Sequence, residues 1–198
     1  MTVKIIIVLF GGILSGMFIF EPEFMSKTDT LLDIGLFFLL FFVGIDIGSN
    51  KKAFIHLKKL GFKLLLIPIS AALGSIFGGL LTAEFLGMKI FEGGAIGAGF
   101  GWYSLSAVLI APYSSEVSTI AFLTNVIREI MAIMLIPLTA KYIGYYETIS
   151  LGGATAMDTT LPIITKNTNG ETAVIAFISG LLMSIMVPII VPVFISLL

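Results

Sequence analysis

The sequence contains no cysteine, a single histidine and few charged residues. Its 198 residues include 11 Lys or Arg and 12 Asp or Glu, which leaves a formal net charge of −1. The absence of cysteine excludes a disulfide framework and thiolate chemistry. The nearly neutral charge gives no electrostatic reason to expect a nucleic-acid partner. The one histidine, His56, lies in a lysine-rich stretch, so a serine–histidine enzyme is not indicated.

Apolar residues are abundant instead. Hydrophobic residues make up 58% of the chain, the mean hydropathy is +1.11 and only 12% of residues are charged, against about 25% in ordinary globular domains. We therefore predict an all-α polytopic membrane protein with a single membrane domain. No small-residue cleavage site precedes Glu21, so the first apolar run is expected to be a retained helix. The predicted spanning helices cover residues 3–20, 31–47, 60–81, 118–140 and 173–198.

Two further segments, 93–111 and 150–165, are short, rich in glycine and interrupted by polar residues. Each is compatible with a full crossing, a broken helix or a re-entrant segment, and seven spans result if both cross. Paired segments of this kind are typical of transporters built on discontinuous helices and inverted repeats. Close glycine-mediated packing of ordinary helices is the alternative.

The orientation follows from a lysine cluster at 51–63, between the second and third predicted helices. The positive-inside rule makes this loop cytoplasmic. The amino terminus is then cytoplasmic and the carboxyl terminus lies outside. Residues 1–30 form a first helix and an outer loop, and residues 31–198 form the rest of the domain.

Asp158 is the leading candidate for a functional residue. A charge at bilayer depth costs roughly 2.5–3.5 kcal/mol on insertion scales, so it marks a site by default. Gly152, Gly153, Thr155 and Thr159 surround it, and together they predict unwound backbone lining a polar cavity. In a wet cavity Asp158 binds a cation, and in a drier one it carries a proton. Capping of a broken helix end by Asp158 is the alternative interpretation.

The other glycine-rich segment carries Gly99, Gly101, Trp102 and Tyr103. In one interpretation the two aromatic residues are interfacial anchors. In the other, a backbone break offers free N–H groups to an anion, because helix N-termini favour negative charge. The hydroxyl groups that would assist are those of Ser104 and Ser106.

Asn125, Arg128 and Glu129 lie within the apolar run 118–140. Consecutive side chains diverge by about 100° on a helix, so Arg128 and Glu129 do not pair well with each other. Charges in the middle of a span usually line a transport pathway, which we favour. Pairing with neighbouring helices is the alternative.

Four stretches together resemble the LysO-type lysine exporter family of bacteria. They are G-F-G-W-Y-S-L-S at 99–106, Arg128-Glu129 followed by Ile136-Pro137, G-A-T-A-M-D with T-L-P at 153–162, and L-F-F-V-G-I at 40–45. The resemblance runs from about residue 31 to the end.

The resemblance implies export of L-lysine and its toxic analogues across the inner membrane, without a cofactor or bound metal. It implies a fold related to cation/proton antiporters, of which this chain would be half to two-thirds. Asp158 would be the acid needed for transport and for proton coupling. The glycine-rich segment and Arg128-Glu129 would belong to the substrate pathway.

Two departures from the family pattern bear on this interpretation. Usual members carry several more membrane segments at the amino terminus, so a homodimer or a small partner subunit is expected here. Thr124-Asn125 stands where relatives have Asn-Asp. A channel-like or structural subunit of a split transporter is the alternative function. An intramembrane aspartyl hydrolase, pairing Asp158 with Asp33 or Asp46, is a remote one.

Overall fold

The computed structural model describes residues 2–19, 34, 38, 41–42, 45 and 61–198. The predicted helix at 31–47 and most of the lysine cluster at 51–63 therefore lie largely outside the described residues. Within the described ranges every element is helical. The predicted all-α class holds for this part of the chain.

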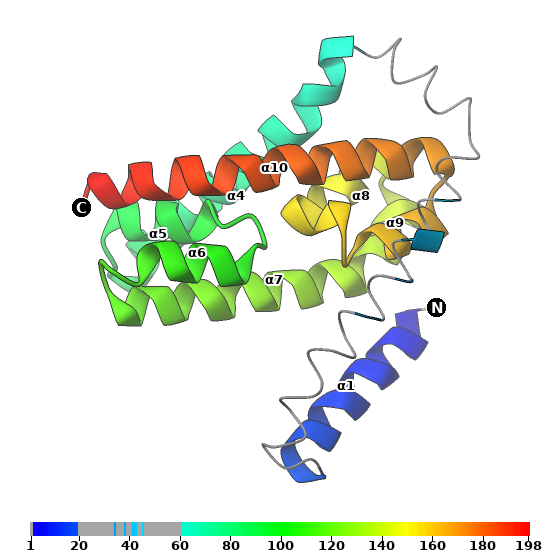
Figure 1. Ribbon diagram of the computed structural model, residues 1–198, viewed down its shortest axis with the longest axis horizontal. Coiled ribbons are helices and arrows are strands. Elements are labelled where there is room, and N and C mark those ends of the chain that lie inside the picture. The colour runs from blue at the N-terminus through cyan, green and yellow to red at the C-terminus, as the bar shows by residue number, and fades with distance from the viewer. Residues whose placement is uncertain (1, 20–33, 35–37, 39–40, 43–44, 46–60) are drawn as a thin grey trace.

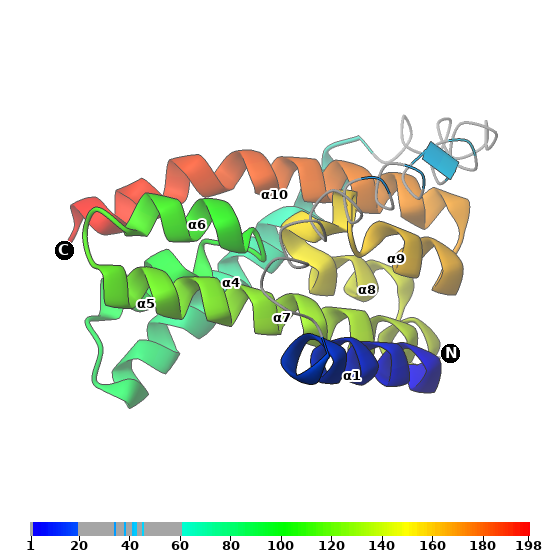
Figure 2. The ribbon, with the colours of Figure 1, turned by 60° about the horizontal axis from the view of Figure 1, so that its bottom comes forward.

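Three described helices are long and apolar enough to cross a membrane: α4 (Leu66–Leu86), α7 (Ser115–Tyr142) and α10 (Gly170–Ser196). They correspond to the predicted runs 60–81, 118–140 and 173–198. A short 3-10 helix, η1 (Gly61–Leu65), leads into α4. Helix α1 (Thr2–Phe18) contacts α7 and lies beside its second half (Figure 2). The total of seven spans stays a prediction.

Side-chain caps explain where the two longest helices begin. Ser114 accepts a hydrogen bond from the Val117 N–H at 3.3 Å, and Asn169 accepts one from the Thr172 N–H at 2.8 Å. Each cap satisfies one of the free N–H groups in a first helical turn. Helices α7 and α10 therefore begin slightly before the apolar runs predicted at 118 and 173.

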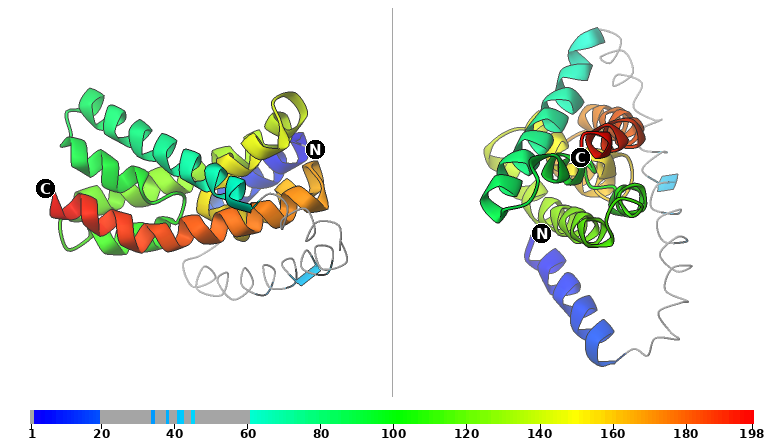
Figure 3. Two further views of the ribbon diagram at one scale, coloured as in Figure 1. Left: turned by 90° about the horizontal axis from the view of Figure 1, so that it is seen from above. Right: turned by 90° about the vertical axis from the view of Figure 1, so that its left-hand side faces the viewer.

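The two glycine-rich segments are helical hairpins. The first is α5 (Ile90–Gly97) and α6 (Tyr103–Ile110); the second is α8 (Tyr145–Gly152), η2 (Gly153–Met157) and α9 (Leu161–Asn167). Each hairpin begins and ends at one end of the molecule, and the two lie at opposite ends (Figures 1 and 3). Neither segment is one continuous helix.

A polar cluster closes the base of the first hairpin. Lys89 Nζ donates to the Tyr113 hydroxyl at 3.0 Å, and that hydroxyl donates to Glu92 Oε1 at 2.8 Å. The hydrogen bond to Tyr113 raises the pKa of the exposed Lys89 above its ordinary value. Residues before α5 and after α6 are thus held together at the base of the hairpin.

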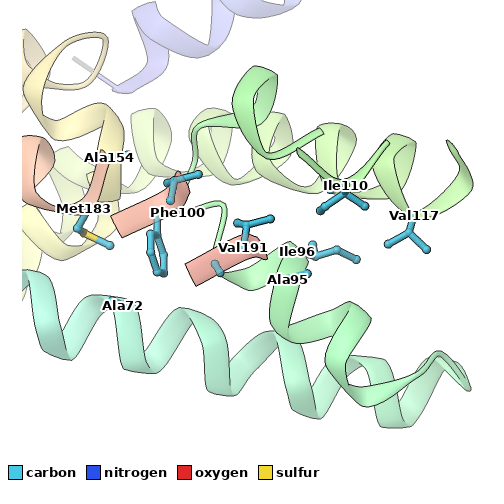
Figure 4. Packing of buried hydrophobic residues seen from close by; sticks show 12 residues of the cluster. Ala72, Ala95, Ile96, Phe100, Ile110, Val117, Ala154, Met183 and Val191 are labelled. Carbon is cyan, nitrogen blue, oxygen red and sulfur yellow. The ribbon is translucent and has the colours of Figure 1, made fainter. Parts of the chain in front are cut away.

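The tips of the two hairpins meet in the middle of the molecule. The Ala154 N–H of the second tip donates to the Phe100 carbonyl of the first at 2.9 Å. Phe100 is fully buried in one cluster with Ala72 of α4, Ala154 of η2 and Met183 of α10 (Figure 4). Its φ of 49° lies in the left-handed region, a conformation that costs a non-glycine residue about 1–3 kcal/mol and is found mostly at functional sites.

The second half of the described chain repeats the element pattern of the first. Helices α5 and α7 begin at Ile90 and Ser115, and α8 and α10 begin at Tyr145 and Gly170, so the same interval of 55 residues separates these two pairs of helices. We call this interval the repeat spacing. The helices α5, α6 and α7 have 8, 8 and 28 residues, and α8, α9 and α10 have 8, 7 and 27. The repeat spacing also joins buried positions on the two long helices: Val117 with Thr172, Ala121 with Ala176, Asn125 with Gly180, Ala132 with Val187, and Ile136 with Val191.

Helices α4 and α5 pack so closely that one glycine tolerates no side chain. A Cβ built on Gly79 would collide with the carbonyl oxygen of Gly93, whereas the Cβ position of the neighbouring Gly78 meets no other element within 4 Å. We predict that Gly79→Ala destabilises the protein by about 1–3 kcal/mol, the usual cost of overpacking. Gly78→Ala is the matched control and should melt at or slightly above the temperature of the unmutated protein, because alanine favours helix. Thermal unfolding in detergent measures both variants, and equal melting temperatures would contradict this packing.

Candidate functional site

A cavity of about 230 Å³ lies where the two hairpin tips meet. Its walls come from the start of α6, the middle of α7, the turn after η2 and the middle of α10. The lining residues are Gly101, Trp102, Tyr103, Ser104, Glu129, Ala154, Thr155, Met157, Asp158, Thr159 and Ser184. Polar side chains from both hairpins and both long helices therefore converge on one space within an apolar bundle.

Two carboxylates in this cavity share one hydroxyl group. Thr159 donates its hydroxyl to Glu129 Oε1, and the oxygen of that hydroxyl lies 3.4 Å from Asp158 Oδ1. The Thr159 N–H also donates to Asp158 Oδ1 at 2.6 Å. The Tyr103 phenol lines the same cavity as both acids. Two like charges this close together repel, so the pair is suited to hold a proton or a cation.

Asn125 organises the backbone of the first tip. It is 2% exposed. Its Oδ1 accepts from the Gly101 N–H at 2.8 Å, and its Nδ2 donates to the carbonyls of Ala121 at 2.9 Å and Ile96 at 3.3 Å. A carboxylate could accept from Gly101, but it could not donate to the two carbonyls. The amide of Asn125 thus fits this arrangement in a way that a charged aspartate would not.

The second tip is held by threonine hydroxyls and by close contact with α10. Thr155 Oγ1 donates to the Gly152 carbonyl at 2.8 Å and lies 3.2 Å from Thr160 Oγ1. A Cβ built on Gly180 would lie 2.9 Å from the Ala154 carbonyl oxygen and from Met157 Cβ. Glycine at position 180 therefore allows η2 to approach α10, which brings Asp158 to the cavity.

The predicted site residues divide into three groups. Those that line the cavity are Gly101, Trp102, Tyr103, Ser104, Glu129, Thr155, Asp158 and Thr159. Those that support its walls are Asn125, Ser106, Gly99, Gly152 and Gly153. Arg128 alone lies behind the tips and borders two other cavities, of which the larger measures about 580 Å³ and lies between α4, α7 and α8.

Sequence reasoning missed two polar or polarisable residues of the cavity, Met157 and Ser184. Ser184 donates to the Gly180 carbonyl at 2.9 Å and lies 3.6 Å from the Met157 sulfur. A single serine in an apolar run carries no signal by itself. The signal that could have found it is the repeat spacing, which relates Ser184 to Glu129.

Comparison with known proteins places the chain in a family. A family model described as "Lysine exporter LysO" matches residues 6–195. The chain belongs to this lysine exporter family. The resemblance carried by the motifs at 99–106, 128–137 and 153–162 is thereby confirmed, and the family is one of transporters rather than enzymes.

Two curated relatives cover most of the chain. A "Putative lysine exporter" of Haemophilus influenzae is 39% identical over 162 residues, which are 80% of this chain and 80% of that protein. "Lysine exporter LysO" of Escherichia coli K12 is 32% identical over 174 residues, or 86% of this chain and 57% of that protein. The matching region thus spans less than two thirds of the E. coli protein. No solved structure matches the chain.

We predict that Asn125→Ala destabilises the protein by about 1–3 kcal/mol, because it leaves buried donors and acceptors without partners. Thr124→Ala is the matched control: Thr124 is an exposed neighbour on the same helix and should change the melting temperature little. Thermal unfolding in detergent checks both variants. A loss no greater for Asn125→Ala than for Thr124→Ala would show that the amide does not hold the first tip.

Proposed function

We propose that this chain takes part in the export of L-lysine, or of a similar cationic amino acid, across the bacterial inner membrane. The observation that carries the proposal is the pair Glu129 and Asp158, joined by Thr159 in a small cavity between two hairpin tips. Acids inside membrane segments are costly and mark substrate or proton pathways. The names of both curated relatives support lysine as the substrate.

Each end of the substrate has a complementary partner in the cavity. An ammonium group of lysine would lie between the carboxylates of Asp158 and Glu129. Its carboxylate would face the start of α6, where no side chain caps the first turn and Ser104 supplies a hydroxyl. Unpaired N–H groups at a helix N-terminus favour an anion.

Proton coupling follows from the same pair of acids. The two carboxylates repel each other when both are ionised, and either a proton or a substrate ammonium relieves that repulsion. A proton on Asp158 would therefore compete with bound lysine. Entry of protons from outside would release lysine there, and loss of the proton to the cytoplasm would restore the empty site for the next substrate.

We also propose that residues 90–142 and 145–196 are an inverted repeat. The equal spacing, the matching helix lengths and the positions of the hairpins at opposite ends support it. Lys141 and Lys166 lie in the last turns of α7 and α9, at the end of the molecule that carries the second hairpin, so this end would be cytoplasmic. The carboxyl terminus would then lie outside.

A second membrane chain, either another copy or a partner subunit, would complete the transporter. The large apolar cavity between α4, α7 and α8 supports this arrangement, because a gap within the bundle offers a place for a further helix. Cross-linking in native membranes would reveal the partner.

The first test is labelled-lysine efflux from proteoliposomes. We expect saturable efflux from the unmutated protein, competed by lysine and ornithine but not by leucine. Asp158→Asn should lower the rate by about tenfold or more, since it removes a charge interaction in the transition state worth at least about 1.4 kcal/mol. Glu116→Gln is the control, because Glu116 is exposed in the first turn of α7 and away from the cavity.

Each outcome of this test has a separate meaning. Undiminished efflux in Asp158→Asn would refute the assignment of the site. Efflux that does not saturate would indicate a channel. No efflux from the unmutated chain alone, followed by efflux after co-reconstitution with its cross-linked partner, would identify a split transporter.

Proton coupling has its own test in the same vesicles. Acidifying the side toward which lysine moves should accelerate net efflux severalfold, because protons then run down their gradient in exchange. Asp158→Asn should abolish the response to pH in whatever flux remains. Lysine flux of unchanged rate under either pH gradient would contradict proton coupling but would leave lysine export intact.

A further inference from the structure

Arg128 lies on the opposite side of the hairpin tips from the two acids. It does not line the cavity that holds Glu129 and Asp158, although it precedes Glu129 directly in the chain. Consecutive side chains on a helix diverge by about 100°, so Arg128 and Glu129 point to different sides of α7. A role for Arg128 as a ligand of the substrate carboxylate therefore fits poorly with this geometry.

The guanidinium group of Arg128 occupies the space left by the missing side chain of one glycine in each tip. A Cβ built on Gly101 would lie 2.8 Å from Arg128 Nη1, and one built on Gly153 would lie 2.5 Å from both Nη1 and Nη2. Both glycines have positive φ, 98° and 61°. The two tips thus carry glycine at the two positions against which Arg128 packs, and a side chain at either would expel it.

The short helices α5 and α8 both end near Arg128. Helix α5 ends at Gly97, which borders the same cavity as Arg128, and α8 ends at Gly152, whose carbonyl oxygen lies 3.8 Å from the Cβ position of Gly101. The last carbonyls of a helix carry partial negative charge and favour a cation. Among the described residues Arg128 forms no hydrogen bond or ion pair with an acid. The Phe100 carbonyl oxygen and the guanidinium group both lie against the Cβ position of Gly153, so a backbone carbonyl of the first tip is close to this cation.

Carbonyl ends of broken helices and unwound backbone are where transporters of this general construction hold a coupling Na⁺. We propose that Arg128 is a positioning residue that supplies a permanent cation at this point, so that the crossing of the two tips is assembled without a metal ion and transport needs no Na⁺. The inference rests on the proposed export function and specifies the coupling ion. The coupling proton binds Asp158, and the cation where the two tips meet is the Arg128 side chain.

The test measures lysine efflux kinetics for Arg128→Ala and Arg128→Lys beside the unmutated protein. We expect Arg128→Ala to lower the maximal rate by about tenfold or more while changing KM by less than about twofold, the pattern of a group that does not bind substrate. Arg128→Lys, which keeps the charge but loses the planar fork, should retain more activity than Arg128→Ala. Lys141→Ala, which removes an exposed cation at the end of α7, is the matched control and should leave the kinetics unchanged.

Chemical rescue distinguishes a requirement for a cation where the two tips meet from a purely structural role of Arg128. Millimolar guanidinium chloride should restore efflux severalfold in Arg128→Ala and should leave the unmutated protein unaffected. Replacing Na⁺ by choline on both sides should not change efflux by the unmutated protein. Arg128→Ala should remain monodisperse in detergent, and if it does not, the Arg128→Lys kinetics and the choline experiment decide.

Several results would overturn the proposal. A KM raised by about tenfold with an unchanged maximal rate in Arg128→Ala would make Arg128 a ligand of the substrate carboxylate. Efflux by the unmutated protein that requires Na⁺ would overturn it as well, as would a folded Arg128→Ala that guanidinium does not rescue. Absence of lysine efflux from the unmutated protein would instead count against the proposed function, which keeps the two failures distinct.

Discussion

The constraint on which this structure depends is that backbone groups in an apolar bundle must find partners inside the protein. Both glycine-rich segments leave helix at their tips and expose N–H and carbonyl groups there. The tips satisfy one another through Ala154 and Phe100, and Asn125 serves Gly101. The candidate cavity exists because these unwound segments are stabilised in contact with each other, between α7 and α10.

The same crossing separates charges of opposite sign. Arg128 packs against Gly101 and Gly153 of the two tips, and the start of α6 lines the cavity of Glu129 and Asp158. The N-terminus of α6 favours the negative charge of these acids. Helix α7 supplies both the basic Arg128 and the acidic Glu129 from consecutive positions. This one helix therefore fixes the positions of the two hairpins relative to each other.

The sequence predicted the long helices well because hydropathy summed over a whole membrane crossing is a strong signal, and α4, α7 and α10 lie within a few residues of the expected runs. It also singled out Asp158, which lines the polar cavity, since an acid among glycines and threonines is rare in apolar surroundings. The hairpin at 93–111 could not be distinguished from a continuous or broken helix in advance, because all three have the same composition. The side of α7 to which Arg128 points depends on tertiary packing, and Ser184 resembles any serine in an apolar helix.

The repeat spacing has a consequence for the conformational cycle. It relates Tyr103 to Asp158, Ser104 to Thr159 and Glu129 to Ser184, so the cavity is lined by equivalent positions that carry different side chains. If the two repeats differ slightly in hairpin tilt, exchanging their conformations produces a second state with the same helix lengths and contacts. In the proposed inverted repeat, that state would open toward the other side of the membrane. The inward-facing and outward-facing forms would then differ only in which repeat adopts which conformation.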